Sequence, residues 1–286
     1  MEGVRLVNPE RTPLADLLPR VSTNREVVHL KRIDETGTVV SNLEGQTEYE
    51  YPQAETETSE TDFDIIGYGY KEAVSDKLIL STENIYDAQS VVELSMVNAI
   101  RQYEEKQIAR GTDENWGNDE NGFEGLPDIG EEADVLDLND KSTKDVLDKV
   151  RSIKDTAIEN GATEGDLIVA VSFDVWEDLR DELSDKPLYE VQISEFSYGF
   201  NSLLVDGVKV MKSHGFNSYD DVDKDNNEPI AVAVDTSDTA MYTLRDVSLE
   251  PLAKREAAEL MSVSCYATLA TRAPSHIQYL AIEDSA

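Results

Sequence analysis

The sequence predicts an α+β fold, in which one long helix and several extended segments surround a compact region of alternating helices and strands. The longest helical pattern spans residues 84–110 and contains neither Gly nor Pro. Residues 143–245 alternate segments of helical period with short apolar runs, which is typical of helices packed on strands. Residues 247–282 are mostly extended, and apolar residues take every second position around Cys265.

The chain is strongly acidic. Its 60 Asp and Glu residues against 25 Lys and Arg residues give a formal net charge of −35. Such a charge destabilises a compact state in dilute buffer by self-repulsion. In about 1 M salt the screening length falls to roughly 3 Å, and most of that repulsion disappears. We therefore predict adaptation to high salt. The alternative, an acidic and partly disordered chain, fits poorly with the apolar periodicity of several segments.

Composition also restricts partners and location. Sequence-independent binding of nucleic acid needs clustered Lys and Arg. The sequence contains no basic patch with interleaved aromatic residues. The start of the chain lacks the apolar stretch of a signal peptide, and no apolar run reaches the roughly 18 residues of a membrane span. Cys265 is the one cysteine, so no intrachain disulfide can form. We expect it to be buried in a strand, and the chain to fold in a reducing cytoplasm.

Residues 1–25 are expected to form an extended N-terminal arm. Residues 1–32 hold six basic and four acidic residues, three prolines and little periodicity. A weakly basic segment on a very acidic body would pair with the body of a neighbouring copy. The bases predicted to make these inter-subunit contacts are Arg5, Arg11, Arg20 and Arg25. A terminus without fixed structure is the alternative.

A projecting hairpin is predicted next. Residues 26–33 and 38–43 are both rich in apolar residues of extended pattern, and residues 34–37 between them supply a Gly-containing turn. Residues 44–64 then hold eight acids and no base, so they cannot contribute much to a core. We expect the hairpin to lead into this acidic stretch as a projecting loop.

The long helix is predicted to begin near Asn84, which can cap it, and to end at Gly111. Apolar residues recur between them at steps of three and four. At about 1.5 Å per residue, this helix would be roughly 40 Å long. Residues 111–140 hold eleven acids and no base, and are expected to form a long irregular loop.

The compact region combines strong local signals. Gly161 can end its first helix, Ser172 can cap its second, and Asp206-Gly207 is typical of a hairpin turn. The predicted elements are helix 143–160, strand 167–171, a helix after Ser172, strands 203–205 and 208–211, and strands 230–234 and 240–244.

In this order, the elements resemble those of the Hong Kong 97-like major capsid proteins of tailed bacterial and archaeal viruses. One stretch is similar to the strand, spine helix and Gly-containing turn of that family: Ala73-Val74-Ser75-Asp76-Lys77-Leu78-Ile79-Leu80-Ser81, the long helix, Ile108-Ala109-Arg110-Gly111-Thr112-Asp113 and Gly122-Phe123-Glu124-Gly125-Leu126. A second is similar to its axial domain: Leu167-Ile168-Val169-Ala170-Val171-Ser172, Trp176-Glu177-Asp178-Leu179 and Leu204-Val205-Asp206-Gly207-Val208-Lys209-Val210.

The resemblance implies a structural protein that assembles into hexamers and pentamers of an icosahedral shell around viral double-stranded DNA. It implies five parts: an N-terminal arm 1–25, an extended loop 26–65, a peripheral domain with spine helix and acidic loop 66–134, an axial domain 135–245, and returning strands of the peripheral domain 246–286. It also implies scaffold, portal and decoration proteins as partners, and a place in the virion after assembly in the host cytoplasm. The composition adds a halophilic archaeon as host. Some members crosslink a lysine of the extended loop to a neighbour; Lys31 is the one lysine within 26–65, and we expect packing in salt to suffice.

No catalytic motif is present, and no cofactor is expected. His29, His214 and His276 have no ligand spacing between them and are expected to be packed or solvated. A metal candidate is the loop that starts with Asp221, Asp223 and Asp225 in the alternation of a calcium-binding loop. Its sixth position is Asn226 in place of Gly, and its twelfth is Val232 in place of Glu. A solvated acidic loop is the alternative.

Three other functions stay open. An encapsulin-type cellular compartment shell has the same fold, but generally lacks so long an extended loop. A halophilic cytoplasmic enzyme of unrecognised class would need a pocket with convergent polar groups. A tail or adhesion component would often contain sequence repeats, and we find none.

Overall fold

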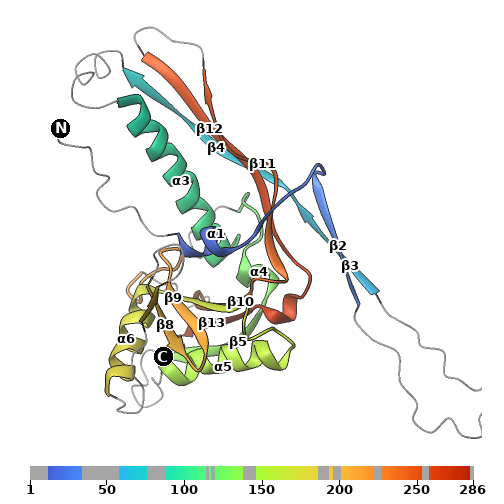
Figure 1. The fold of residues 1–286 in the computed structure, drawn as a ribbon, viewed down its shortest axis with the longest axis vertical. Coiled ribbons are helices and arrows are strands. Elements are labelled where there is room, and N and C mark those ends of the chain that lie inside the picture. Colours follow the sequence, from blue (N-terminus) through green and yellow to red (C-terminus); the bar gives the residue numbers. More distant parts are fainter. Residues whose placement is uncertain are drawn as a thin grey trace, which may run out of the picture.

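The computed structural model describes residues 12–33, 58–75, 88–113, 116, 120–137, 146–185, 193–195, 201–221, 227–252 and 258–283. These residues form a body of two sheets and several helices, from which a two-stranded ribbon projects (Figure 1). The predicted α+β class is confirmed. None of the helices in the described part of the chain has the length and hydropathy of a membrane span.

The helices and strands of these residues succeed one another along the chain in a fixed order. They are α1 (Pro13–Leu17), β1 (Arg20–Ser22), β2 (Val27–Ile33), β3 (Thr58–Asp64), β4 (Ile66–Ser75), α3 (Ala88–Arg110), α4 (Leu126–Ile129), β5 (Glu131–Asp137), α5 (Val146–Glu159), β6 (Leu167–Val171), α6 (Phe173–Asp185), β7 (Ile193–Glu195), β8 (Asn201–Val205), β9 (Val208–Lys212), β10 (Pro229–Asp235), β11 (Thr239–Pro251), β12 (Ala258–Thr271), a 3-10 turn η3 (Pro274–His276) and β13 (Gln278–Glu283).

A seven-stranded sheet of order β5-β13-β10-β6-β9-β8-β7 forms the compact part of the body. Its central strands β6 and β10 are buried at every position, because the sheet is covered on both faces. In β6, Val169 and Val171 pack with α5 and α6 in one core. The alternate residues Ile168 and Ala170 pack in a second core that includes residues of α1 and α3. A continuous apolar run is the pattern of a strand covered in this way.

A four-stranded sheet of order β1-β11-β12-β4 forms the upper part of the molecule in Figure 1, and α3 lies along it. Met96 and Ile100 of α3 pack in one core with Val263 and Cys265 of β12. The C-terminal end of α3 also contacts β10 of the seven-stranded sheet. The helix therefore joins the two sheets.

The local signals of the sequence are found where they were predicted. Gly111 and Gly161 follow the ends of α3 and α5 with φ of 73° and 111°. Asp206 and Gly207 both have positive φ between β8 and β9, as a type I′ turn requires. The backbone N–H of Val175 donates to Ser172 Oγ at 3.3 Å, which confirms the predicted cap. Asn84 lies outside the described residues.

The N-terminal segment differs from the extended arm that the sequence predicts. Residues 12–22 belong to the body: Leu14 and Leu18 are buried in the core next to α3. Strand β1 pairs in parallel with β11, with Arg20 opposite Met241. The apolar residues between the prolines, predicted to be part of a loose arm, find a partner surface only in three dimensions. Residues 1–11 lie outside the described part.

The described partner of β2 also differs from the predicted one. β2 pairs with β3, from the acidic stretch; residues 38–43, the predicted partner, lie outside the described residues. Apolar Phe63 alternates with the acids of β3, and it is buried beside Val28 of β2 and Ala270 of β12. One buried apolar residue on the inner face therefore suffices to pack an otherwise acidic strand against the body.

Two further predictions are corrected by the seven-stranded sheet. Residues 111–140 are not one irregular loop, since they include α4 and the edge strand β5, whose Leu136 is fully buried. The C-terminal strand β13, expected in the peripheral domain, lies between β5 and β10 in the seven-stranded sheet. Because acidic residues surround Leu136, the periodicity of the sequence did not reveal the short apolar face of β5.

Candidate assembly surfaces

The two-stranded ribbon of β2 and β3, called the projecting ribbon from this point on, extends away from the body of the described fold (Figure 1). Its strands pair in antiparallel register from Val27 opposite Asp64 to Ile33 opposite Thr58. Val28 and Phe63 attach its base to β12. The ribbon is thus held at its base, and its other end points away from the described part of the body (Figure 1).

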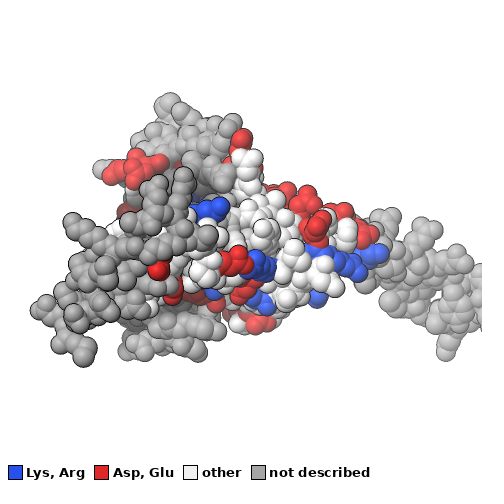
Figure 2. Space-filling view, turned by 90° about the horizontal axis from the view of Figure 1, so that it is seen from above, with Lys and Arg blue, Asp and Glu red and all other residues white. Residues whose placement is uncertain are grey.

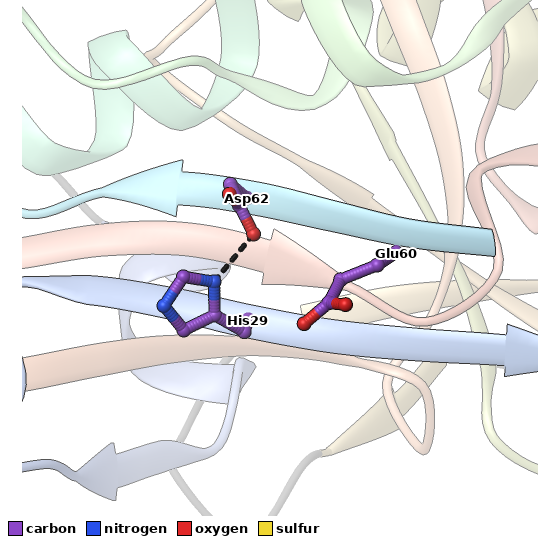
Figure 3. A group of neighbouring side chains, drawn as sticks. All are labelled: His29, Glu60 and Asp62. Atoms are coloured by element: carbon purple, nitrogen blue, oxygen red, sulfur yellow. Dashed lines mark hydrogen bonds and ion pairs between the residues drawn. The ribbon is translucent and has the colours of Figure 1, made fainter.

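The solvent face of the projecting ribbon carries a ladder of cross-strand polar pairs. His29 Nδ1 lies 2.5 Å from Asp62 Oδ1, and Lys31 Nζ lies 3.6 Å from Glu60 Oε2 (Figure 3 shows the His29 pair and Glu60). Each pair joins residues directly opposite in the register. Exposed cross-strand pairs contribute about 0.2–1 kcal/mol each, so their main effect is to favour this register.

The same ladder brings donor atoms of His29, Glu60 and Asp62 within 4.8 Å of one another. All three side chains are exposed. Cross-strand pairing already accounts for their arrangement, and we assign no metal to them.

Charge is divided along the projecting ribbon. On the face that Figure 2 shows, acidic side chains lie along one edge of the ribbon and basic side chains along the other. The division follows from the strands, since β3 carries Glu60, Asp62 and Asp64 whereas β2 carries Lys31. A ribbon with opposite charges on its edges can be oriented by a charged surface of another molecule.

A shallow groove of about 340 Å³, the sheet groove, lies on the outer face of β4 and β12. Its floor is made of small residues, and Tyr266, 42% exposed, forms a wall. Gly69 is required at its position, because a Cβ atom there would lie 2.2 Å from the backbone oxygen of Val263. The floor and wall residues are Gly67, Gly69, Ser262, Ser264 and Tyr266.

A larger cavity of about 460 Å³ lies between β4 and α3. Its lining includes Tyr70, Ala99, Ile100 and Tyr103, with Asn121 as the one side-chain amide. Among the described residues, the titratable groups of this lining are the phenols of its tyrosines.

Two adjacent buried acids anchor the N-terminal segment to α3. Glu104 accepts hydrogen bonds from Arg20, Arg101 and Tyr68, the last at 2.6 Å. Glu105 accepts from the backbone N–H groups of Leu14 and Ala15 and from the Ser213 hydroxyl. These contacts connect α1, β1, α3 and both sheets.

The two acids escaped the sequence analysis because two of 60 acids in a chain do not stand out. One signal was available. Glu104 lies four residues after Ile100 and four before Ile108, so it falls on the apolar face of the helix. Burial raises the pKa of Glu105 to about 7.

Cys265 lies beside this anchor. It is fully buried in β12, as predicted, and its thiol lies 3.7 Å from Glu104 Oε1. Burial, with a contribution from the charge of Glu104, raises the pKa of the thiol to about 11. A thiol in this state is a poor nucleophile.

The bases predicted at subunit contacts have different surroundings. Arg20 is bonded to Glu104 and Asp246 of its own chain, so its guanidinium serves the fold; its contact with a neighbouring copy stays a prediction. Arg25 is exposed. Arg5 and Arg11 lie outside the described residues.

The other predicted site residues are dispersed. Asp221 is exposed and accepts a hydrogen bond from Ser218 at 3.0 Å, and Asp223 and Asp225 lie outside the described residues. His214 is exposed. His29 and His276 contact Asp62 and Asp238, partners 33 and 38 residues away that sequence spacing could not find.

No family model and no curated protein matches the chain. Solved structures match it over nearly its whole length. The capsid of a native GTA particle has a TM-score of 0.71 at 10% identity, covering 99% of this chain and 94% of the other. The capsid protein of the cyanophage P-SCSP1u has a TM-score of 0.70 at 12% identity, covering 99% and 92%.

A cellular compartment protein matches as well. The SrpI encapsulin from Synechococcus elongatus has a TM-score of 0.69 at 10% identity, covering 100% of this chain and 93% of the other. At such identities the likeness concerns the fold alone. The predicted fold is confirmed: the chain has the Hong Kong 97-like fold that viral capsid proteins share with encapsulins.

Proposed function

We propose that the chain is the major capsid protein of a tailed double-stranded DNA virus, and that it assembles into hexamers and pentamers of an icosahedral shell. The observation that carries this proposal is the projecting ribbon, whose base packs on its own body around Val28 and Phe63, in a fold shared with shell proteins. A two-stranded ribbon is marginally stable by itself in water. It gains stability when a second molecule covers it.

The sheet groove of a neighbouring copy is the surface that we assign to the ribbon. Its floor of glycines and serines allows close approach of another backbone, and exposed Tyr266 supplies apolar area. Basic Lys71 at its rim suits the acidic edge of the ribbon. Many such contacts, each formed between identical copies, would close a shell.

High salt is part of the proposed assembly. With a net charge of −35 per subunit, copies in contact repel one another unless ions screen them. This supports a halophilic archaeon as the host. The shell would enclose DNA as a wall without specific binding, in a virion assembled in the host cytoplasm with scaffold, portal and decoration proteins.

An encapsulin-type compartment is the second candidate, and the match to the SrpI encapsulin favours it. Its particles would carry protein cargo rather than packaged DNA. Nuclease-protected DNA in particles recovered from the producing cells would therefore support the viral function, and protein cargo the compartment.

The test of shell formation is electron microscopy of the purified full chain in about 1 M and about 3 M salt. We expect closed particles of uniform size. A charge-reversed ribbon, Glu60→Lys with Asp62→Lys, should reduce particle yield at least about tenfold while circular dichroism stays unchanged. The control, Glu159→Lys with Glu164→Lys, makes the same change of charge on exposed residues of the compact body and should assemble normally. A chain that stays a compact monomer at every salt and protein concentration contradicts the proposal.

A further inference from the structure

A cluster of metal-ligating side chains lies where the chain passes between the two sheets. Asp235 ends β10, Asp238 precedes β11, and His276 ends η3 between β12 and β13. Their donor atoms all lie within 4.8 Å of one another. Both passages between the sheets thus contribute to one cluster, which is separate from the projecting ribbon and the sheet groove.

The histidine ring determines what the cluster lacks. His276 Nε2 lies 3.1 Å from the backbone oxygen of Asn160, which can only accept a hydrogen bond, so Nε2 carries the hydrogen. In a neutral ring the other nitrogen, Nδ1, then carries a lone pair and can only accept a hydrogen bond. It lies 3.0 Å from Asp238 Oδ2, also an acceptor. Two acceptors at this distance repel each other unless a cation, either a proton or a metal ion, lies between them.

The third side chain adds a buried carboxylate beside this pair. Asp235 is fully buried and has both oxygens held, Oδ1 by Ser237 and Oδ2 by the backbone N–H of Thr163. Its negative charge would stabilise any cation between Asp238 and His276, a proton included, but only a metal ion would take it as a third ligand.

The surroundings are those of a metal ligand set. A ligating histidine commonly donates its other N–H to a backbone carbonyl, as His276 does to Asn160. Two donor atoms 3.0 Å apart can both lie about 2.1 Å from one ion. The Asn160 side chain also donates to the backbone oxygen of Ser275, which fixes η3 against the end of α5.

We propose that Asp235, Asp238 and His276 bind a first-row divalent transition-metal ion such as Zn²⁺. An imidazole nitrogen with carboxylate oxygens suits this class, while Mg²⁺ and Ca²⁺ prefer oxygen ligands alone. Water would complete the coordination on the exposed side, where Asp238 and His276 are 29% and 16% exposed. The ion would connect both passages between the sheets with the end of α5. This inference does not depend on shell formation.

The chain has three histidines, so His29→Gln with His214→Gln leaves His276 alone and removes the ribbon cluster. We would titrate this full-length variant with Zn²⁺ and Co²⁺ in high salt and about 100-fold excess Mg²⁺, which saturates unspecific acidic sites. We expect one ion per chain, a shift of the single imidazole NMR signal with Zn²⁺, visible absorption of bound Co²⁺, and a higher Tm.

Adding His276→Gln or Asp238→Asn to this variant should weaken Zn²⁺ binding at least about tenfold. The matched control, Asp221→Asn, changes an exposed aspartate of the acidic loop and should leave binding unchanged. Displacement of Zn²⁺ by Mg²⁺, or an imidazole signal that responds to pH but not to Zn²⁺, would show a shared proton only and overturn the proposal. If the additional variants do not fold, the NMR and Co²⁺ measurements on the parent variant still decide it.

Discussion

Glu104 and Glu105 are neighbours in the sequence, yet their buried carboxylates are compensated by different groups. The carboxylate of Glu104 contacts the cations Arg20 and Arg101. That of Glu105 is held by two backbone N–H groups and one hydroxyl in a fully buried position. An ion pair compensates a buried charge more completely than neutral donors do. The two residues should therefore respond differently to pH and to substitution.

Replacing Glu105 by Gln should change the pH dependence of stability. The pKa of Glu105 is about 7 in the fold against 4.5 ordinarily, so the folded state binds the additional proton between these values. The wild type then loses stability as pH rises from about 4.5 to 7, on the order of 3 kcal/mol in total. Urea unfolding at pH 5 and pH 8 should show the Gln variant gaining relative to wild type at pH 8.

A suitable control for this measurement is Glu159→Gln, at an exposed position at the end of α5, which should follow the wild type at both pH values. Equal wild-type-to-E105Q differences at pH 5 and pH 8 would refute the raised pKa.

Replacing Glu104 by Gln should be more costly than replacing Arg20 by Ala. Glu104 is fully buried, and its loss removes the carboxylate that Arg20 and Arg101 both contact; breaking a buried ion pair typically costs about 3–5 kcal/mol. Arg20 is 18% exposed, and Arg101 would remain for Glu104. A double-mutant cycle in urea should give a coupling free energy of about 1–3 kcal/mol.

The exposed pair of Arg180 and Glu177 on α6 offers a comparison on one helix, and its cycle should couple by less than about 0.5 kcal/mol. Coupling as small as this at Arg20 and Glu104 would mean that the anchor does not hold β1.

At the scale of elements, residues 12–22 of the N-terminal segment are packed into the body. Deleting residues 1–11 should leave the body folded and impair assembly, if the bases Arg5 and Arg11 contact a neighbour. Deleting residues 1–22 also removes α1 and β1, exposing the core next to Leu14 and uncovering Glu105. Each buried Leu contributes about 2–5 kcal/mol, so this deletion should lower Tm strongly.

Both deletions can be followed by circular dichroism for the fold and by particle counts for assembly. Full assembly by the shorter deletion would remove the role of the arm, and a wild-type Tm for the longer one would show that α1 is dispensable.

For the whole molecule, ionic strength is the controlling variable. Lowering salt from about 1 M to about 0.1 M extends the screening length from roughly 3 Å to roughly 10 Å, a distance over which neighbouring copies repel. We expect particles to dissociate and the urea midpoint of the subunit to fall. Light scattering during dialysis measures the first, and denaturation curves the second.

Sucrose at matched osmolality serves as the control, since it stabilises by exclusion without screening charge and should not prevent dissociation. Particles that persist at very low ionic strength would show that screening is not what permits the subunits to meet.

Local signals were sufficient for much of the fold. Gly111, Gly161, Ser172 and the turn at Asp206 act on neighbouring residues, and each lies where its element ends or begins. The element order from the long helix onward, compared with a known architecture, was enough for the fold class.

The long-range pairings were decided only in three dimensions. They include the pairing of β2 with β3, of β1 with β11, the place of β13 beside β10, and the meeting of His276 with Asp235 and Asp238. In each pairing the partners lie far apart along the chain, and nothing in a single sequence indicates that they meet. Acidic strands with a single apolar residue look the same as loops until that residue has a core to enter. Burial of that residue, and not its propensity, selects the partner.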